Sequence, residues 1–376
     1  MRPKAGKYGR WRRGRWFMRK MARNIAVFAD GTWESNEAAN PTNVVKLHAA
    51  LLPQDAAGNP QISIYQIGLG SEGWKAWRLL SGATGAGLSE NVQDLYGYLV
   101  LNYRPGDKLF LFGFSRGAYT VRSLSGLIRS CGILRPENYE RIEEAYARYI
   151  ERGIETHPRA VRSRNFRQAY AWPEFAQPDD FVIHCIGVWD TVGSLGIPGT
   201  RVEALVERFH DTDLSTFTHY AFQALAVDER RSTFVPCLWT QQVDAPATQV
   251  LEQIWFAGVH CDVGGGYKED GLSNDTLAWM WRRAEQAGLA LDKMQFPARN
   301  PFDVLHNSMD TWYYKLLGWF RSGARKIVLK QPPPAPNTNQ GVHASVKARF
   351  DRQDLHYRPK NLETYLKDPQ SVYVKD

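Results

Sequence analysis

LFLFGFSRGAYTVRSLSGLIRSCG, residues 109–132, predicts a buried strand, a sharp turn and a helix in direct succession. The apolar run before Gly113 is typical of a strand covered on both faces. After Ser115 the apolar side chains recur every three or four residues, as on one face of a helix, and Gly132 follows where that helix would end. These helical positions are Ala118, Val121, Leu124, Ile128 and Cys131. The single hydroxyl in the turn, that of Ser115, therefore needs an explanation.

Strand and helix patterns alternate along the rest of the chain. Four further apolar runs predict strands: NIAVFADGT, ISIYQIGLG, FVIHCIGVWDT and QIWFAGVHCD, which begin at residues 24, 62, 181 and 253. Helices are predicted over TNVVKLHAALL, ENVQDLYGYLVLNY and HYAFQALAVDERR, which begin at residues 42, 90 and 219. This alternation predicts an α/β fold, a mostly parallel sheet with helices on both faces, whose ligand site lies at the carboxyl ends of the strands.

The composition indicates one large folded domain. Hydrophobic residues make up 43% and aromatic residues 12% of the 376 residues, which is enough to fill a large core and unlike a disordered chain. The net charge of +8 is concentrated in residues 1–23, which hold ten Lys or Arg and no Asp or Glu; subtracting these ten charges leaves the remainder near −2. The net charge of the domain itself therefore does not indicate a nucleic-acid-binding protein.

The basic tail, residues 1–23, mixes its cations with Trp11, Trp16 and Phe17, which suits contact with anionic lipid or nucleic acid. The alternatives are a solvated extension, or a start at Met21 that removes the tail. The aromatic and basic segment 312–330 suits either peripheral membrane contact or packing within the protein.

The sequence has neither a secretory signal nor an apolar span of about 18 residues, so we expect synthesis in the cytoplasm and export only by a signal-independent system.

We expect the domain over residues 24–362, followed by a C-terminal tail at 363–376. ENYERIEEAYARYIERG, which begins at residue 137, predicts an exposed helix and, with the polar stretch after it, a cap insertion over the sheet at about 135–180. QPPPAPNTNQ, residues 331–340, predicts an extended connector. The four cysteines are far apart and mostly within apolar runs, which favours buried thiols over disulfides or a CxxC metal site.

Gly113 to Gly117 match the pattern G-x-S-x-G, in which small flanking residues let the turn close and lift the serine Oγ off the sheet. A serine becomes a nucleophile when a base takes its proton and an acid orients that base. Asp190 and His260 each end a predicted strand, at the same edge as Ser115. The order Ser115, Asp190, His260 is that of α/β hydrolases, and it predicts nucleophile, acid and base. The alternative for Ser115 is a helix N-cap in a tight turn.

Three other residues are candidates for supporting roles. His343 is the rival base, and Asp228 and Asp262 are rival acids. Each has a structural alternative, such as an ion pair with a neighbouring arginine.

An oxyanion formed on an acyl group needs backbone N–H donors. The N–H of Arg116, at the start of the predicted helix, is one candidate. The loop after the first strand, Asp30-Gly31-Thr32, offers the second donor through Gly31 or Thr32. Asp30 is alternatively the cap of the turn that follows it.

Seven motifs occur together in this chain, in the order FADGTW, GFSRGAYTVRSLSGLI, GVWDTVGSLG, ALAVDERRSTFVP, WFAGVHCDVGGGY, GLSNDTLAWM and HASVKAR. This series resembles the catalytic domain shared by type VI secretion phospholipase effectors and many uncharacterised bacterial and fungal proteins, from about Asn24 to about Leu362. The resemblance implies an α/β-hydrolase-like fold and a Ser-Asp-His triad that acts on ester bonds, with phospholipase A activity in the effectors. Carried over by position, it assigns the triad to Ser115, Asp190 and His260, and it implies a phospholipid or another acyl ester as substrate.

Two other functions stay open on the residues alone. A soluble esterase or thioesterase would use the same three side chains without meeting a membrane. GLGSEG, residues 68–73, fits the G-x-G-x-x-G pattern of nucleotide-binding proteins, but the sequence after it is a poor start for a phosphate-binding helix and no Walker lysine is present. We expect no cofactor and no required metal, since spacing places no third ligand beside His260 and Asp262.

Overall fold

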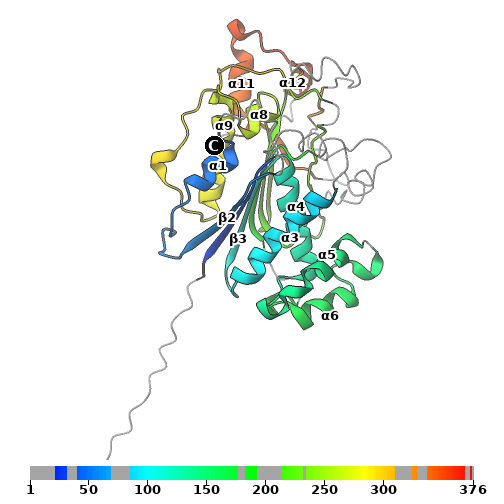
Figure 1. Cartoon of the computed structure of the whole chain (residues 1–376). Coiled ribbons are helices and arrows are strands. Elements are labelled where there is room, and N and C mark those ends of the chain that lie inside the picture. Colours follow the sequence, from blue (N-terminus) through cyan, green and yellow to red (C-terminus); the bar gives the residue numbers. More distant parts are fainter. Residues whose placement is uncertain are drawn as a thin grey trace, which may run out of the picture.

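The computed structural model describes residues 22–31, 40–68, 85–151, 153–176, 183–192, 213–231, 234–309, 324–327, 337–368 and 373–374. Eight strands form one sheet in the order β10-β9-β8-β6-β4-β3-β1-β2, and all their recorded pairings are parallel (Figure 1). These strands are β1 (Asn24–Ala29), β2 (Gln61–Gln66), β3 (Lys108–Phe114), β4 (Ile183–Trp189), β6 (Thr218–Ala226), β8 (Val250–Phe256), β9 (Gln340–His343) and β10 (Tyr373–Val374). A separate parallel pair joins β5 (Asp213–Leu214) and β7 (Thr240–Gln241). The predicted α/β fold is confirmed.

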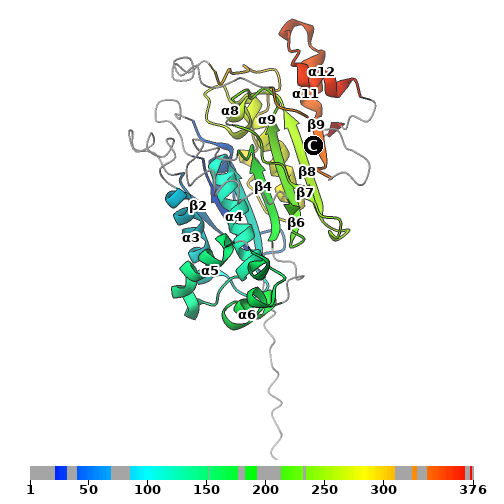
Figure 2. The ribbon, with the colours of Figure 1, turned by 90° about the vertical axis from the view of Figure 1, so that its right-hand side faces the viewer.

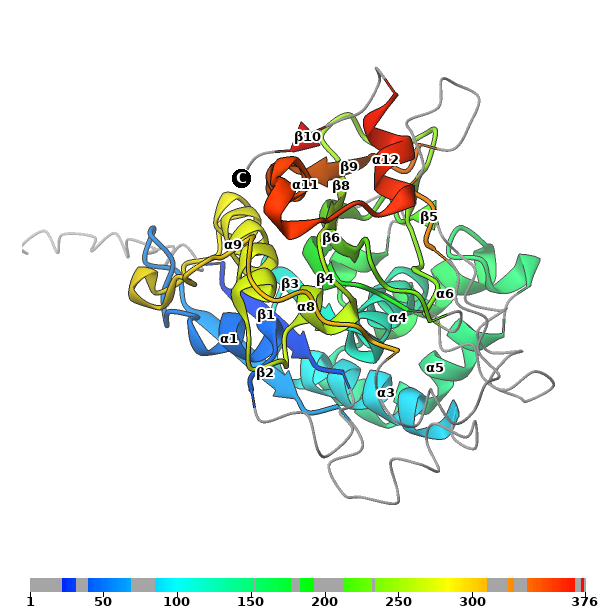
Figure 3. The ribbon, with the colours of Figure 1, turned by 90° about the horizontal axis from the view of Figure 1, so that it is seen from above.

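Helices cover both faces of the sheet (Figure 3). On one face α3 (Gly85–Asn102) and α4 (Arg116–Cys131) pack against strand side chains such as Val27, and on the other α1 (Asn43–Ala49) and α9 (Gly271–Gln286) pack against side chains such as Phe28. Because both faces are covered, each strand is an almost continuous apolar run. A third cluster packs α11 (Ala344–Asp351) and α12 (Lys360–Leu366) against β8 and β9. Outside the insertion described below, the other short elements of the described residues are α8 (His260–Gly264), η4 (Lys293–Gln295) and η5 (Gln353–Leu355).

One predicted helix is wrong. HYAFQALAVDERR contains β6, a strand between β4 and β8 in the middle of the sheet. Its three alanines favour a helix, but both neighbours offer a full parallel hydrogen-bond ladder and both faces of the strand are buried. Tertiary packing therefore overrides the local helix propensity.

The insertion is an amphipathic layer beside α4. It comprises α5 (Ile142–Ile150) and α6 (Val161–Tyr170) with η1 (Pro136–Arg141), η2 (Ile154–Thr156) and η3 (Pro173–Phe175). The helix predicted to be exposed, α5, buries Ile142, Ala145, Tyr146 and Tyr149. Figures 1 and 2 show α5 and α6 at the end of the molecule opposite α8, rather than over the carboxyl edge of the sheet. The insertion therefore does not cover the strand ends, as a lid would.

The domain also extends further than predicted. β10 lies in the segment expected to be a C-terminal tail, and it pairs with β9 in the sheet. Several sequence features lie outside the described residues: residues 1–21 with Met21, Thr32, residues 69–73 of the glycine motif, most of 312–330, and residues 331–336 of the connector. Among the helices described, none combines the length and hydropathy needed to cross a bilayer.

The predicted strand, turn and helix around Ser115 are present as β3 and α4, and Gly132 ends the helix with a positive φ of 72°. Ser115 has φ 56° and ψ −119°, an unusual conformation for a non-glycine residue. A Cβ on Gly113 would lie 2.5 Å from the Gly117 carbonyl oxygen, and a Cβ on Gly117 would lie 2.1 Å from the Ala29 carbonyl oxygen. Both flanking positions therefore exclude a side chain.

We expect Gly117→Ala to lower the free energy of unfolding by about 2 kcal/mol or more, because rigid backbone meets the added methyl group. Gly153→Ala is the matched control, since its Cβ would lie 3.8 Å from the nearest atom, Thr156 Oγ1, and should change stability by less than about 0.5 kcal/mol. Chemical denaturation measures both. Equal stability of the two variants would contradict the close approach of β1 to the turn.

Candidate active site

A continuous chain of hydrogen bonds links Ser115, His260 and Asp190 at the carboxyl edge of the sheet. The Ser115 Oγ lies 2.9 Å from His260 Nε2, and His260 Nδ1 lies 2.6 Å from Asp190 Oδ2. Asp190 is fully buried and His260 is 4% exposed, whereas Ser115 is partly exposed. One end of the chain is thus accessible to a ligand, and the other end is sealed from water.

The ends of neighbouring parallel strands hold these side chains in place. Ser115 follows β3, and its N–H donates to the Trp189 carbonyl at 3.1 Å. Asp190 follows β4 with φ 40°, and its N–H donates to the Ala224 carbonyl at 2.8 Å. Ser115 occupies the N-cap position of α4, as the alternative expected, but its side chain makes no capping hydrogen bond, so capping does not explain the hydroxyl.

His260 lies three residues beyond β8, as the first residue of α8. Its ring packs against Phe114, with ring centres 4.7 Å apart, and against the edge of Phe234 at 5.0 Å. Burial lowers the pKa of His260, although Asp190 acts in the opposite direction. The imidazole is therefore neutral at neutral pH, as a proton acceptor must be.

Arg325 neutralises the buried charge of Asp190. Its Nη1 donates to Asp190 Oδ1 at 2.6 Å and its Nη2 donates to Oδ2 at 3.1 Å, and the guanidinium also donates to the carbonyls of Ala226 and Phe234. Burial raises the pKa of Asp190, but Arg325 and His260 together hold it well below its usual range. Asp190 is therefore an ionised acceptor that fixes the orientation of the imidazole.

The sequence did not reveal Arg325. It lies 135 positions beyond Asp190, in a basic segment with no motif of its own. The only available signal was the rule that a carboxylate buried at the end of a central strand requires a cationic partner. That rule does not say which of the chain's many arginines provides it.

The first two residues after β1, Asp30 and Gly31, differ in their roles from the prediction. Asp30 is 6% exposed; its Oδ1 accepts from the Gly31 N–H at 2.7 Å, and its Oδ2 accepts from the hydroxyls of Thr42 and Tyr65. The Gly31 N–H is therefore engaged by Asp30, which corrects its role as an oxyanion donor. Gly31 instead allows close approach, since a Cβ there would lie 3.1 Å from Ser115 Cβ. Arg116 is the first residue of α4, so its N–H has no partner within the helix.

The rival base, His343, belongs to a different cluster. It ends β9, stacks on Phe256 with ring centres 4.6 Å apart, and lies 2.7 Å through Nδ1 from the hydroxyl of Ser345. That hydroxyl in turn donates to Asp275. Ser345 and Asp275 both lie beside the same ring nitrogen of His343, Nδ1.

The rival acids hold the loop that carries His260. Asp228 Oδ2 accepts from the Gly258 N–H at 2.7 Å and from the Tyr357 hydroxyl at 2.8 Å, and burial raises the pKa of Asp228 to about 6. Asp262 accepts from the Val259 N–H and from His306 Nδ1. Neither carboxylate contacts the His260 imidazole in a recorded hydrogen bond.

Glu229, which the sequence analysis missed, touches His260 directly. Its Oε2 accepts the backbone N–H of His260 at 3.2 Å, and Arg231 pairs with the same carboxylate. Burial alone would raise the pKa of Glu229, but Arg231 and the surrounding donors lower it to about 2. Within the described parts of the chain, no three His, Cys, Asp or Glu side chains are grouped to hold a metal ion.

A parallel sheet with a serine on a strained turn, hydrogen-bonded to a histidine and a buried aspartate, is the architecture of an α/β hydrolase. Residues 23–283 match the family described as T6SS, Phospholipase effector Tle1-like, catalytic domain. The chain belongs to this family. Arg325 lies beyond the matched residues.

Two further similarities are more distant. The chain is 28% identical over 231 residues to the uncharacterized protein YEL023C of Saccharomyces cerevisiae, which covers 58% of this chain and 33% of the yeast protein. An uncharacterized protein from Pseudomonas aeruginosa is similar in structure, with a TM-score of 0.40 and 16% identity over 72% of this chain and 46% of that one. The chain thus spans about a third of the yeast relative and just under half of the bacterial one.

We expect Arg325→Gln to raise the pKa of His260, because the Asp190 charge then acts on the imidazole without compensation. Below that pKa the ring is protonated, so the pH range in which it can accept a proton shifts upward. An NMR titration of isotope-labelled histidines measures the change. Arg325→Lys keeps the charge and should shift the pKa less; an unchanged or lower pKa in Arg325→Gln would contradict the pairing.

Proposed function

We propose that this protein hydrolyses carboxylic ester bonds of phospholipids, with Ser115 as nucleophile, His260 as general base and Asp190 as the orienting acid. The observation that carries the proposal is the unbroken chain from Ser115 Oγ through His260 to Asp190, at 2.9 and 2.6 Å. Membership of a phospholipase effector family supports the ester bond and the lipid substrate.

The residues suit two-step acyl transfer. His260 Nε2 takes the proton from Ser115 Oγ as the oxygen attacks the ester carbonyl, and the imidazolium formed is stabilised by Asp190. His260 then protonates the departing alcohol, which leaves the acyl group on Ser115. A water molecule then attacks the carbonyl of the acyl group on Ser115, and His260 takes the proton of that water. His260 next returns the proton to Ser115 Oγ as the bond to the acyl group breaks, which releases the fatty acid.

The oxyanion of each tetrahedral intermediate needs two donors. We assign one to the N–H of Arg116, at the positive end of α4. For the second we retain Thr32 of the β1 loop, which lies outside the described residues, in place of Gly31. Contact with the lipid surface through the basic tail and residues 312–330 is part of the same proposal.

Replacing Ser115 by Ala should reduce fatty-acid release from phospholipid by at least about 10³-fold, because no other group supplies the nucleophile. The free energy of unfolding should change by less than about 1.5 kcal/mol, since alanine keeps the same backbone conformation and loses only the hydrogen bond to His260. His260→Gln should have a loss of similar size, whereas His343→Gln should retain activity. Release of fatty acid from micellar phospholipid by the purified chain is the assay.

Retained activity in Ser115→Ala would reject the mechanism. Cleavage of short soluble esters or thioesters without any cleavage of phospholipid would retain the triad and reject the lipid substrate. The two parts of the proposal therefore fail separately.

A further inference from the structure

The loop that carries His260 is held by three carboxylates, one for each of three consecutive backbone N–H groups. The donors are Gly258, Val259 and His260, and their acceptors, in the same order, are Asp228 at 2.7 Å, Asp262 at 3.0 Å and Glu229 at 3.2 Å. His260 is the first residue of α8, a helix of five residues, which is too short to be stable by itself. The position of the imidazole therefore depends on what holds these carboxylates.

Asp262 is built into the turn that it holds. It is the third residue of α8, and its Oδ2 accepts the N–H of Val259, the residue that caps the helix. Asp262 is buried and packs against Gly258, where an added Cβ would lie 2.3 Å from Asp262 Cβ. A displacement of the Asp262 side chain would therefore move the backbone that carries His260.

His306 binds both oxygens of the Asp262 carboxylate. Its Nδ1 lies 2.6 Å from Oδ1, and its backbone N–H donates to Oδ2 at 3.2 Å. The ring stacks on Tyr267, with ring centres 3.8 Å apart, and its Nε2 lies 3.5 Å from Glu269 Oε2. The imidazole of His306 is thus fixed by a stacked ring and by a carboxylate at each nitrogen.

His306 also brings a positive charge to Asp262. The hydrogen bond to Asp262 raises the pKa of His306, partial burial lowers it and Glu269 raises it again, with a net upward shift. The stabilisation from this charged pair is therefore complete below the usual histidine pKa and is lost as the pH rises through the raised value. Burial, and in addition the charge of Asp262, raises the pKa of Asp228, so the two carboxylates repel each other. Arg349 also interacts electrostatically with Asp262, but its recorded hydrogen bonds go to backbone carbonyls.

The same segment of chain reaches a second carboxylate of the loop. The buried Ser308 donates its hydroxyl to Glu229 Oε1 at 2.9 Å, while Glu229 Oε2 accepts the N–H of His260. Arg231 pairs with Glu229 as well, so Ser308 is one of several groups that hold this carboxylate. Residues 306–308 therefore support the loop at two of its three points.

From these contacts we infer that His306 is a positioning residue for the proposed reaction. By holding and neutralising Asp262, it fixes the backbone before His260, and with it the 2.9 Å distance between His260 Nε2 and Ser115 Oγ. Ser308 supports the same loop through Glu229. This role rests on the proposed function, in which His260 is the base, and it is exerted through the loop alone.

The kinetic test compares two substitutions of His306 in the full chain. We expect His306→Leu to lower kcat for phospholipid at least about tenfold and to change KM less than about twofold, because a misplaced base affects the chemical step. His306→Asn keeps an N–H donor at the place of Nδ1, so its kcat should lie within about threefold of that of the unmodified protein.

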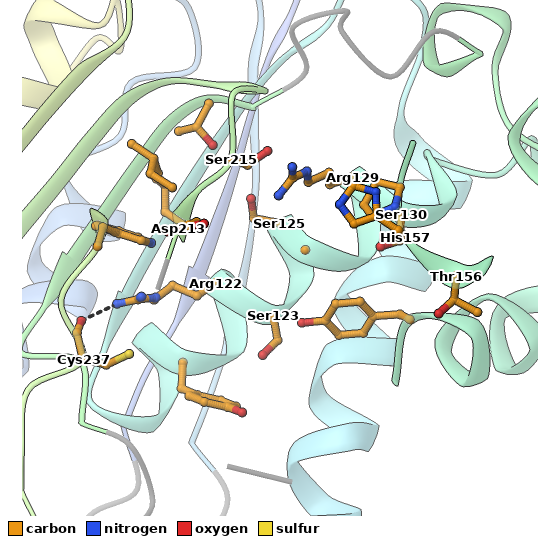
Figure 4. A pocket seen from close by; sticks show the side chains of 18 of the residues that line it. Arg122, Ser123, Ser125, Arg129, Ser130, Thr156, His157, Asp213, Ser215 and Cys237 are labelled. Atoms are coloured by element: carbon orange, nitrogen blue, oxygen red, sulfur yellow. Dashed lines mark hydrogen bonds between the residues drawn. The ribbon is translucent and has the colours of Figure 1, made fainter. Parts of the chain in front are cut away.

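His157→Leu is the matched control. This exposed histidine belongs to the insertion and lines a cavity of about 210 Å³ beside α4 (Figure 4). Its replacement should leave both kcat and KM unchanged. An unchanged kcat in His306→Leu, or a kcat in His306→Asn as low as in His306→Leu, would overturn the inference.

Ser308→Ala is a milder variant that decides the question if His306→Leu does not fold. Glu229 keeps its pair with Arg231, so we expect kcat to fall only about threefold, again with KM unchanged. An unchanged kcat in Ser308→Ala would then count against the role of residues 306–308.

Exchange of the His260 Nδ1 proton with water, followed by NMR, tests the inference without any substrate. We expect His306→Leu to speed this exchange at least about tenfold, because a looser loop opens the hydrogen bond to Asp190, whereas His157→Leu should not change it. Faster exchange in His306→Leu, together with an unmodified protein that cleaves no ester, would retain the role of His306 in the loop and reject the proposed function. An unchanged exchange rate would overturn the inference even if the unmodified protein cleaves phospholipid.

Discussion

The fully buried carboxylate of Asp190 is the constraint on which the rest of the site depends. A charge in this environment is costly unless it is paired and hydrogen-bonded, and here three groups meet it: His260 Nδ1, the Arg325 guanidinium and the backbone N–H of Ala226. Arg325 removes most of the cost and keeps the carboxylate ionised. His260 is thereby fixed in the orientation that places its other nitrogen on Ser115. Ser115 is the exposed end of this hydrogen-bonded chain, and the buried pair of Asp190 and Arg325 holds the chain in place.

Parallel strands give this arrangement its precision. β3 and β4 are adjacent, and each ends in a residue with positive φ, Ser115 and Asp190. A non-glycine residue adopts that conformation only when its surroundings enforce it. Here the enforcement comes from the backbone hydrogen bonds of each residue to the next strand, and from the bare glycines that let β1 approach the turn. Asp228 and Glu229, just beyond β6, hold the backbone around His260 through their carboxylates, which accept the N–H groups of Gly258 and His260.

Local sequence patterns were sufficient to predict the strand and helix around Ser115. They were insufficient to predict which charged residues pair within the site. Helix α4, its glycine stop and the strand before it follow from spacing that is visible in one short segment. Chain order and strand ends also bring Ser115, Asp190 and His260 to one edge of the sheet, although their catalytic roles stay predictions. β6 was taken for a helix because propensity carries no information about two neighbouring strands. Arg325 and Glu229 could not be chosen, because only the folded chain shows which cation and which carboxylate become buried together.

The central claim is that Ser115, and no other serine, is made reactive by these contacts. Labelling the purified chain with a fluorophosphonate probe, followed by peptide mapping, tests it without assuming any substrate. The account predicts one modified peptide that contains Ser115, with labelling abolished in His260→Gln. Label on a different serine, or no label on a folded protein, would contradict it.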